Sequence, residues 1–272
     1  MWHDGFVTPA TAQGSRVAGA RERARAEITR EIMDTARRHL STDGAAGLSL
    51  RAVARDLGMV SSALYRYVPS RDDLLTRLIV SAYDSMGAAA EAAEHAVPRE
   101  DLDGRFRAVA RAVRRWAVEH EHEYALIYGS PVPGYRAPET TIPSATRVPA
   151  LLIRIIRDGL ASGRLHPDGR VVPPEALATM RPALEAFAAQ DGSPPPPDLV
   201  VRALMSWTYL FGAVSFDLFG HRHNVIVDER AAEHPFFEHE LDRLVELIGL
   251  GPDAKALTDR PLAEAGISRA GR

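Results

Sequence analysis

The chain has 272 residues, 46% of them hydrophobic and 25% charged, which is ordinary for a soluble globular protein of one or two domains. It contains no cysteine, which excludes disulfides and thiolate metal sites, and no uninterrupted apolar run approaches the roughly 18 residues that span a bilayer. The net charge is −3, but residues 1–80 carry 12 Arg against 9 Asp or Glu, so attraction to phosphate is expected only from this part.

The first 19 residues differ in composition from the rest of the chain. They mix Gly, Pro, Thr and Ala without periodicity, which predicts a disordered segment over residues 1–19. They also lack the charged stretch and apolar core of a secretory signal, so we expect a cytoplasmic protein that makes no contact with a membrane.

An amphipathic helix is predicted from Ala20 onward. Apolar residues recur every four positions from Ile28 to Leu40, with Arg and Glu between them, and the pattern ends near Asp43-Gly44. The first turns, RERARAE, hold three arginines that could lie along a phosphate backbone. From this stretch alone we favour the alternative, a solvated helix face with internal Arg–Glu pairs.

Two short helices joined by a tight turn are predicted next. Ser49 is a favourable N-cap for the helix LRAVARDL, and Gly58 ends that helix because glycine tolerates the left-handed conformation. The following helix, SSALYRY, is too short to be stable alone and ends before Pro69. This arrangement is typical of a helix-turn-helix, whose second helix enters the major groove of DNA.

The rest of the chain is also predicted to be helical. Ser70 caps a helix that runs to about His95, with Asp73 in the position of a capping-box acid. We find no convincing strand and no internal repeat. Residues 199–220 are apolar nearly all round, which indicates burial in the core or against a partner subunit. Residues 251–272 are predicted to form a flexible tail. The remaining helices are predicted at about 102–120, 148–165, 199–220 and 234–249.

The segment Ser49–Leu75 resembles the DNA-binding motif of the tetracycline-repressor (TetR) family of bacterial transcription regulators. This resemblance implies an all-α protein with a three-helix, helix-turn-helix domain at residues 20–69. A helical ligand-binding and dimerisation domain would follow at 70–250, with 70–95 as the connecting helix. The matching residues are Ser49, Ala54, Gly58-Met59-Val60, Leu64-Tyr65, Tyr67-Val68 and Arg71-Asp72-Asp73-Leu74. A second, weaker match to the ligand-binding halves of some members consists of Trp207, Gly212, Asp217 and Gly220-His221.

Two residues depart from the family pattern. The family usually has Ser at the position of Val60, where it caps the recognition helix, and valine cannot form that hydrogen bond. The helix therefore starts either at Val60 or at Ser61, with Ser61 as a possible replacement cap. Val68 stands where the family usually has Phe, which gives a smaller apolar contact to the next helix.

The predicted DNA-contacting residues lie in and around the recognition helix. Small side chains at its start let it approach base edges closely, and Arg66 is the best candidate for a contact to a base edge or a phosphate. Family members commonly use the two tyrosines for phosphate contacts, although Tyr65 is alternatively a core residue. Arg51 and Arg71 are predicted to contact phosphate, and an arginine at the positive end of a helix favours an anionic partner for Arg71. The full set is Arg51, Ser61, Ser62, Ala63, Tyr65, Arg66, Tyr67 and Arg71.

Aromatic residues of the second domain are candidates for an apolar effector pocket, although a plain core or a dimer interface explains them as well. We consider metal binding for two patches, His120, His122 and Glu123, and His221 with His223. Neither patch has histidines spaced i, i+4, so we predict no metal site and no cofactor. The predicted pocket residues are Trp116, Tyr124, Tyr128, Trp207, Phe211 and Phe216.

Together these patterns predict a homodimeric transcription regulator. Its partners would be a double-stranded DNA operator, a second copy of the chain and a small hydrophobic effector that releases the operator, so that the protein acts as a repressor. The last two large helices would form much of the dimer contact. One alternative is a DNA-binding regulator without a ligand. Another is an enzyme with an incidental helix-turn-helix, but the sequence has no nucleophile elbow, phosphate loop or paired catalytic carboxylates.

Overall fold

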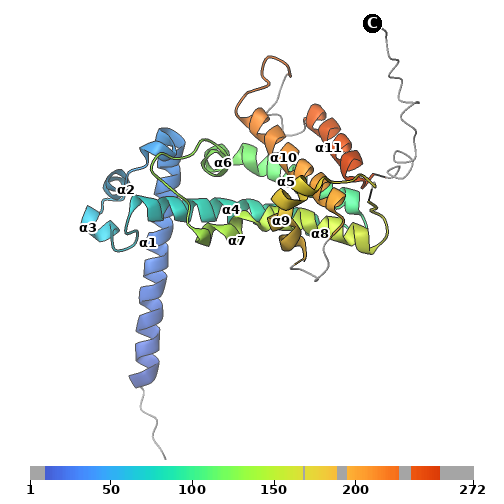
Figure 1. Cartoon of the computed structure of the whole chain (residues 1–272). Helices are drawn as coiled ribbons and strands as arrows, with labels where there is room; N and C mark the ends of the chain where they lie inside the picture. Colours follow the sequence, from blue (N-terminus) through green and yellow to red (C-terminus); the bar gives the residue numbers. More distant parts are fainter. Residues whose placement is uncertain (1–9, 168, 189–194, 227–233, 252–272) are drawn as a thin grey trace, which may run out of the picture. The chain divides into compact units, whose positions relative to one another are not determined.

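The computed structural model describes residues 10–167, 169–188, 195–226 and 234–251, and within these ranges every regular element is a helix (Figure 1). The predicted all-α class is therefore confirmed. The chain divides into two compact units. The first unit comprises the described residues of 1–82 and 122–141, and the second unit comprises the others. The sequence pattern had instead suggested a boundary between residues 69 and 70.

The first unit contains the helix-turn-helix. Its α1 begins at Ala10 rather than at the predicted Ala20, so the helix covers half of the segment that we expected to be disordered. Residues 1–9 and the predicted tail from residue 252 lie outside the described residues. Near its end α1 is interrupted at Gly44, whose φ of 67° matches the predicted stop. The elements of this unit are α1 (Ala10–Gly47), α2 (Leu50–Asp56), α3 (Ser61–Leu64), the start of α4 (Arg71–His95), most of α6 (Glu121–Tyr128) and the 3-10 helix η1 (Glu139–Thr141).

Apolar stripes on these helices form the core of the first unit. Ile32, Ala36 and Leu40 of α1 are buried, as their four-residue repeat predicted. Two hydrogen bonds explain why residues 122–141 belong here although they lie far along the chain. Arg37 donates to Glu123 at 3.2 Å, and the hydroxyls of Thr76 and Tyr135 lie 2.9 Å apart.

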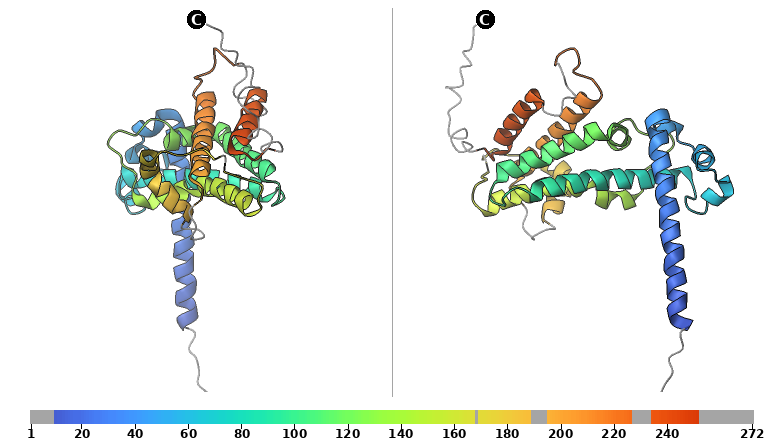
Figure 2. Two further views of the ribbon diagram at one scale, coloured as in Figure 1. Left: turned by 45° about the vertical axis from the view of Figure 1, so that its right-hand side comes forward. Right: turned by 180° about the vertical axis from the view of Figure 1, so that it is seen from behind.

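The second unit is a helical bundle built around α5, α8, α10 and α11, which pack against one another (Figure 2). The four long helices predicted after residue 100 are confirmed. The sequence pattern missed α6, α7 and α9, which are short or, in α9, contain an internal proline at Pro182. Besides the end of α4, the elements are α5 (Leu102–Glu119), α7 (Ile142–Ala145), α8 (Arg147–Ala161), α9 (Pro174–Ala188), α10 (Pro197–Leu218) and α11 (Pro235–Ile248).

Helix α10 is long and apolar enough to cross a membrane by length and composition alone. However, it packs on α5, α8 and α11 and carries Arg202 and Asp217, both of which form ion pairs within this unit, as expected of a core helix. The predicted burial in the core is seen on one side of α10, and the alternative, burial against a partner subunit, stays a prediction for the other side. Met205, Tyr209 and Phe216 are between 43% and 50% exposed.

Candidate DNA-binding site

The recognition helix α3 is anchored by two apolar side chains. Leu64 and Val68 are fully buried, although Val68 is smaller than the residue usual in the resembled family. Backbone hydrogen bonds continue past the end of α3, with the amides of Tyr67 and Val68 donating to the carbonyl of Leu64 at 2.8 and 3.0 Å. With this face held in the core, Ser62, Tyr65 and Arg66 are exposed.

The first turn of α3 shows where the recognition helix begins. Val60 has the extended conformation of an N-cap, with φ −68° and ψ 138°, and α3 starts at Ser61. No side chain caps this helix end, so Ser61 does not replace the missing serine. The preceding turn uses Gly58 at φ 64°, which confirms the left-handed residue predicted at the end of α2. Ser49 occupies the N-cap position of α2, but its side chain makes no capping hydrogen bond.

Residues 61–68, which we call the recognition segment, contact α1 at their C-terminal end. The guanidinium of Arg25 donates to the carbonyl of Arg66 at 3.2 Å and lies 5.3 Å from the ring centroid of Tyr67. A cation at the carbonyl end of a helical segment is stabilising, and its position over an aromatic face adds a cation–π attraction. The ring of Tyr67 is therefore positioned by an arginine from α1, a contact that the local sequence did not predict.

Arg71 has partners other than the predicted phosphate. Its Nε donates to the carbonyl of Leu48 at 3.0 Å, and Nη2 donates to the carbonyls of Ala45 and Ala46 at 2.9 and 3.1 Å. These carbonyl oxygens are the electronegative partners that an arginine at a helix N-terminus needs. Arg71 thus fastens the segment 45–48, which leads into α2. Ser70 caps α4 as predicted, because its Oγ accepts from the amide of Asp73 at 3.0 Å.

The predicted DNA-contacting residues fall into two groups. Arg51, Ser62, Tyr65 and Arg66 are exposed, and the 44% exposure of Tyr65 argues against its interpretation as a core residue. Among the described residues, neither Arg51 nor Arg66 forms an ion pair, which leaves both guanidinium groups available to an anionic ligand. The half-buried group consists of Ser61, Ala63, Tyr67 and Arg71.

A groove of about 430 Å³ lies in the first unit, between the end of α1 and α6 with the loop that follows it. We call it the α1–α6 groove. Sequence reasoning missed it because its two walls are about 80 residues apart in the chain. Asp43 on its rim lies 3.3 Å from Nδ1 of His39, whose Nε2 lies 2.7 Å from Asp56 of α2. The groove is lined by Leu40, Asp43, Gly44, Ala45, Ala46, His122, Ala125, Leu126 and residues 130–133.

The six aromatic residues predicted to form an effector pocket line neither this groove nor a smaller pocket beside α11. Trp116 stacks on His120 and donates to Ser85 at 2.9 Å. Phe216 lies beneath the guanidinium of Arg222, 5.7 Å from its carbon. The six predicted residues therefore take part in several separate ring contacts rather than in one cluster. The remaining pairs are Tyr124 with Tyr128 in the first unit and Trp207 with Phe211 on α10.

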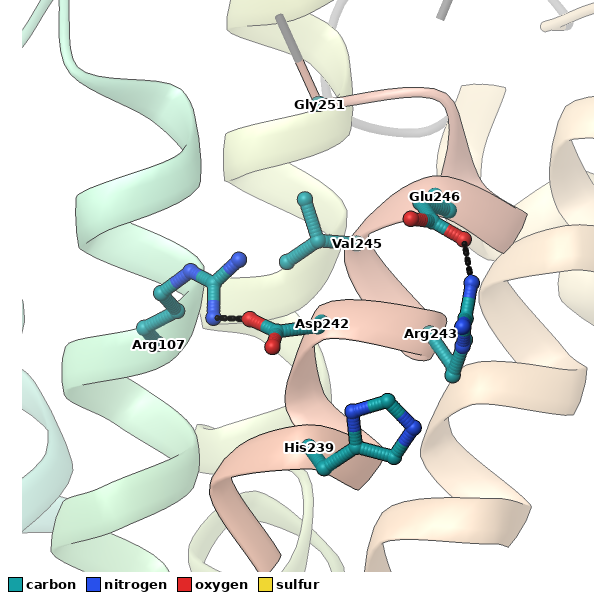
Figure 3. Close-up of a pocket in the computed structure, with 7 residues that line it drawn as sticks. All are labelled: Arg107, His239, Asp242, Arg243, Val245, Glu246 and Gly251. Atoms are coloured by element: carbon teal, nitrogen blue, oxygen red, sulfur yellow. Dashed lines mark hydrogen bonds and ion pairs between the residues drawn. The ribbon is translucent and has the colours of Figure 1, made fainter. Parts of the chain in front are cut away.

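The smaller pocket, beside α11, has a volume of about 230 Å³ (Figure 3). Its charged side chains pair with each other: Arg107 donates to Asp242 at 2.6 Å, and Arg243 donates to Glu246 at 2.9 Å. A pocket of this size and charge does not suit the apolar effector that the aromatic residues suggested. The remaining lining residues are His239, Val245 and Gly251.

The histidine patches considered for a metal have other partners in the structure. Nδ1 of His120 lies 3.0 Å from the carbonyl of Trp116, and the carboxylate of Glu123 accepts from Arg37. His223 similarly lies 2.8 Å from a backbone carbonyl three residues earlier. Within the residues that the structure describes, no group of three or more His, Asp or Glu side chains is arranged to hold a metal ion.

Comparison with known proteins agrees with this geometry. The profile of bacterial regulatory proteins of the tetR family matches residues 32–78, and the profile of the tetracyclin repressor-like C-terminal domain matches residues 106–244. The HTH-type transcriptional regulator Rv1816 of Mycobacterium tuberculosis is 42% identical over 203 residues, which cover 74% of this chain and 85% of that protein. A regulator from Mycobacterium bovis, Mb1846, matches with the same identity and coverage.

Solved structures extend the comparison. The regulatory protein SCO4313 is 33% identical, with a TM-score of 0.66, and the match covers 82% of this chain and 98% of that one. A Rhodococcus sp. RHA1 protein of unknown function shares the fold at 24% identity and a TM-score of 0.57, covering 80% and 93% of the two chains. From the helix-turn-helix, the two matching domains and these relatives, we conclude that the chain belongs to the TetR family of DNA-binding, non-enzymatic transcription regulators.

Proposed function

We propose that the protein is a homodimeric repressor that binds a pseudo-palindromic operator in the cytoplasm and is released from it by a small hydrophobic effector. The proposal of operator binding rests on which faces of α3 are buried and which are exposed. Its apolar face is fixed by Leu64 and Val68, while Ser62, Tyr65 and Arg66 face outward. One such helix from each protomer would read one half-site in the major groove.

Arg66 gives the first test. In the variant Arg66→Ala the free energy of unfolding should stay within about 0.5 kcal/mol of the wild-type value, because the side chain is exposed. Operator affinity should fall by about 1–3 kcal/mol, the usual value of an arginine contact to a base edge. Fluorescence anisotropy with an operator obtained by binding selection measures the affinity. Arg181→Ala in α9 removes the same charge from an exposed site in the second unit and should bind like wild type. Unchanged binding of the Arg66 variant would refute the role of α3.

The exposed faces of α10 and α11 support a homodimer. Met205, Tyr209, Gly212 and Phe216 are spaced four, three and four residues apart and form one stripe along α10. Tyr209 also donates to Glu240 of α11 at 2.7 Å, and partial burial of its hydroxyl, together with that hydrogen bond, raises the pKa of Tyr209 to about 12. Half of the large exposed apolar side chains among the described residues lie on these two helices: Met205, Trp207, Tyr209, Phe216, Phe236 and Leu247. Such a concentration is typical of a surface that a partner covers.

Gly212 allows a specific test of this dimer. A Cβ atom added there meets nothing within 4 Å in the protomer, so Gly212→Leu should fold and even gain helix propensity. If α10 packs on a second copy, a leucine at the centre of the stripe should hold the helices apart. We expect sedimentation to give twice the chain mass of 29.7 kDa for wild type and a dimer at least about tenfold weaker for the variant. Gly212→Ala is the control for the added helix propensity. A wild-type monomer, or a leucine variant that dimerises normally, would contradict the proposal.

We place the effector in the α1–α6 groove rather than among the predicted aromatic residues. Its volume and mainly apolar walls suit a small hydrophobic molecule. One wall contains Ala45 and Ala46, whose carbonyls bind Arg71 just before α2 begins. A ligand that prefers another arrangement of this segment would shift the population of the helix-turn-helix and lower its affinity for the operator.

A further inference from the structure

Helix α1 extends well beyond the core of the first unit. In Figures 1 and 2 its N-terminal half projects away from α2 and α3. Residues 20–27 are all exposed, and Ile32 is the first buried residue among those of α1 whose side chains the structure describes. We call the portion Ala10–Arg25 the α1 arm. At a rise of about 1.5 Å per residue its 16 residues are about 24 Å long. Because residues 20–27 bury no face, this part of α1 gains little stabilisation from packing within the protomer.

The α1 arm is rich in arginine, and its described arginines, Arg21, Arg23 and Arg25, form no ion pair with a neighbouring glutamate. Residues 16–25 contain four arginines and one glutamate. Arg21 and Arg23 are exposed, and within the part of α1 whose side chains the structure describes neither pairs with Glu22 or Glu27. The internal Arg–Glu pairs that the sequence favoured are therefore absent from this stretch. The surface is complementary to a polyanion.

One side of the α1 arm continues the surface of the recognition segment. Arg25 lies against the carbonyl of Arg66 and the ring of Tyr67, which fixes the side of α1 that faces α3. Arg21 is four residues earlier, so it lies on this same side, one turn farther from the core. Arg23 is displaced by about 200° around the helix axis from Arg25 and points to the opposite side.

We propose that the α1 arm is a second DNA-binding element, which lies along the phosphate backbone flanking the half-site read by α3, with Arg21 as a phosphate contact. The occupant is double-stranded DNA because the arm is basic and because Arg25 joins it to the recognition segment. The proposal rests on operator binding through α3. It adds that the protein recognises more DNA than α3 alone can reach, through contacts that do not depend on base sequence.

The test combines two variants with two duplexes, using the full chain. One duplex ends at the outer base pairs of the selected half-sites, and the other extends about ten base pairs, close to one helical turn, on each side. Wild type should bind the extended duplex about tenfold more tightly than the short one. Arg21→Ala should lose about tenfold on the extended duplex, bind the short duplex like wild type, and reduce the slope of log affinity against log salt by about 0.9 for each phosphate that the arm no longer binds. Arg23→Ala, the matched control on the opposite side, should stay within about twofold of wild type.

The outcomes separate this proposal from the proposed function. If Arg66→Ala weakens binding but Arg21→Ala binds both duplexes like wild type, operator recognition by α3 stands and the role of the α1 arm is refuted. Equal losses for Arg21→Ala and Arg23→Ala would also overturn it, because a general charge effect would then replace a defined contact. If wild type selects no operator, the proposed function itself fails. Circular dichroism should show unchanged helix content for both variants, since alanine favours helix.

Discussion

Replacing Arg105 with alanine should lower the free energy of unfolding of the second unit by about 3–5 kcal/mol, the range for breaking a buried ion pair. Arg105 is fully buried, with an exposure of 0%, and Nε donates to Glu94 at 2.8 Å. Its Nη1 donates to the carbonyl of Arg99 at 2.9 Å and lies 2.8 Å from a carboxylate oxygen of Asp158. Removing the guanidinium leaves Glu94, itself only 5% exposed, without its most buried counter-charge.

The matched control for Arg105 is Arg154→Ala. Arg154 binds the same carboxylate, with Nη2 donating to Glu94 at 3.1 Å, but its side chain is 45% exposed. A pair near the surface contributes about 0–1 kcal/mol, so this variant should unfold almost like wild type. Urea denaturation of both variants, followed by circular dichroism, measures the difference. Equal stability of the two variants would show that burial of the network around Glu94 has little energetic consequence.

Replacing Arg71 with alanine should weaken both the fold and DNA binding. The variant leaves the carbonyls of Ala45, Ala46 and Leu48 without the guanidinium that now binds them, at an expected cost of about 1–3 kcal/mol. Because these carbonyls belong to the segment that leads into α2, operator affinity should fall as the helix-turn-helix loses its fixed position. A lysine at this position cannot reach all three carbonyls, so Arg71→Lys should recover only part of the loss.

Salt dependence distinguishes this positioning role of Arg71 from a direct phosphate contact. If Arg71 acts through the segment 45–48, the slope of log affinity against log salt should match wild type while affinity and stability both fall. A direct contact would instead reduce the slope by about 0.9 and leave the free energy of unfolding nearly unchanged. Arg66→Ala serves as the comparison variant, since its effect is expected on DNA binding alone. A normal unfolding free energy for Arg71→Ala would refute the positioning role.

Much of the helix-turn-helix could be predicted from local sequence. Gly58 turns the chain because it adopts a positive φ, and Ser70 caps the next helix because its hydroxyl accepts a backbone hydrogen bond. The apolar repeat that ends at Leu40 likewise predicted the buried face of α1. These signals act over a few residues, so a single sequence contains them completely. Local sequence also predicted that Val60 cannot cap α3, because its side chain accepts no hydrogen bond. The structure added only the residue at which α3 starts, Ser61.

The hydrogen-bond and ion-pair partners of the arginines could not be predicted from local sequence. A long cationic side chain is equally suited to a phosphate, a carboxylate or a carbonyl, and its partner can lie anywhere along the chain. Arg71 reaches back to Leu48, Arg25 reaches forward to Arg66, and Arg37 binds Glu123. The sequence therefore did not predict the backbone carbonyls that Arg71 binds, and its predicted phosphate contact stays a prediction.

By itself, the sequence determined the all-α class, the helix-turn-helix between Ser49 and Leu75 and the family resemblance that the comparisons then confirmed. Only the tertiary structure decided that Arg71 binds the segment before α2, that the α1–α6 groove brings together residues far apart in the chain, and that α1 continues outward as a basic arm. The physical reason is that helices, caps and turns depend on neighbouring residues, whereas ion pairs, grooves and exposed faces depend on residues brought together by folding.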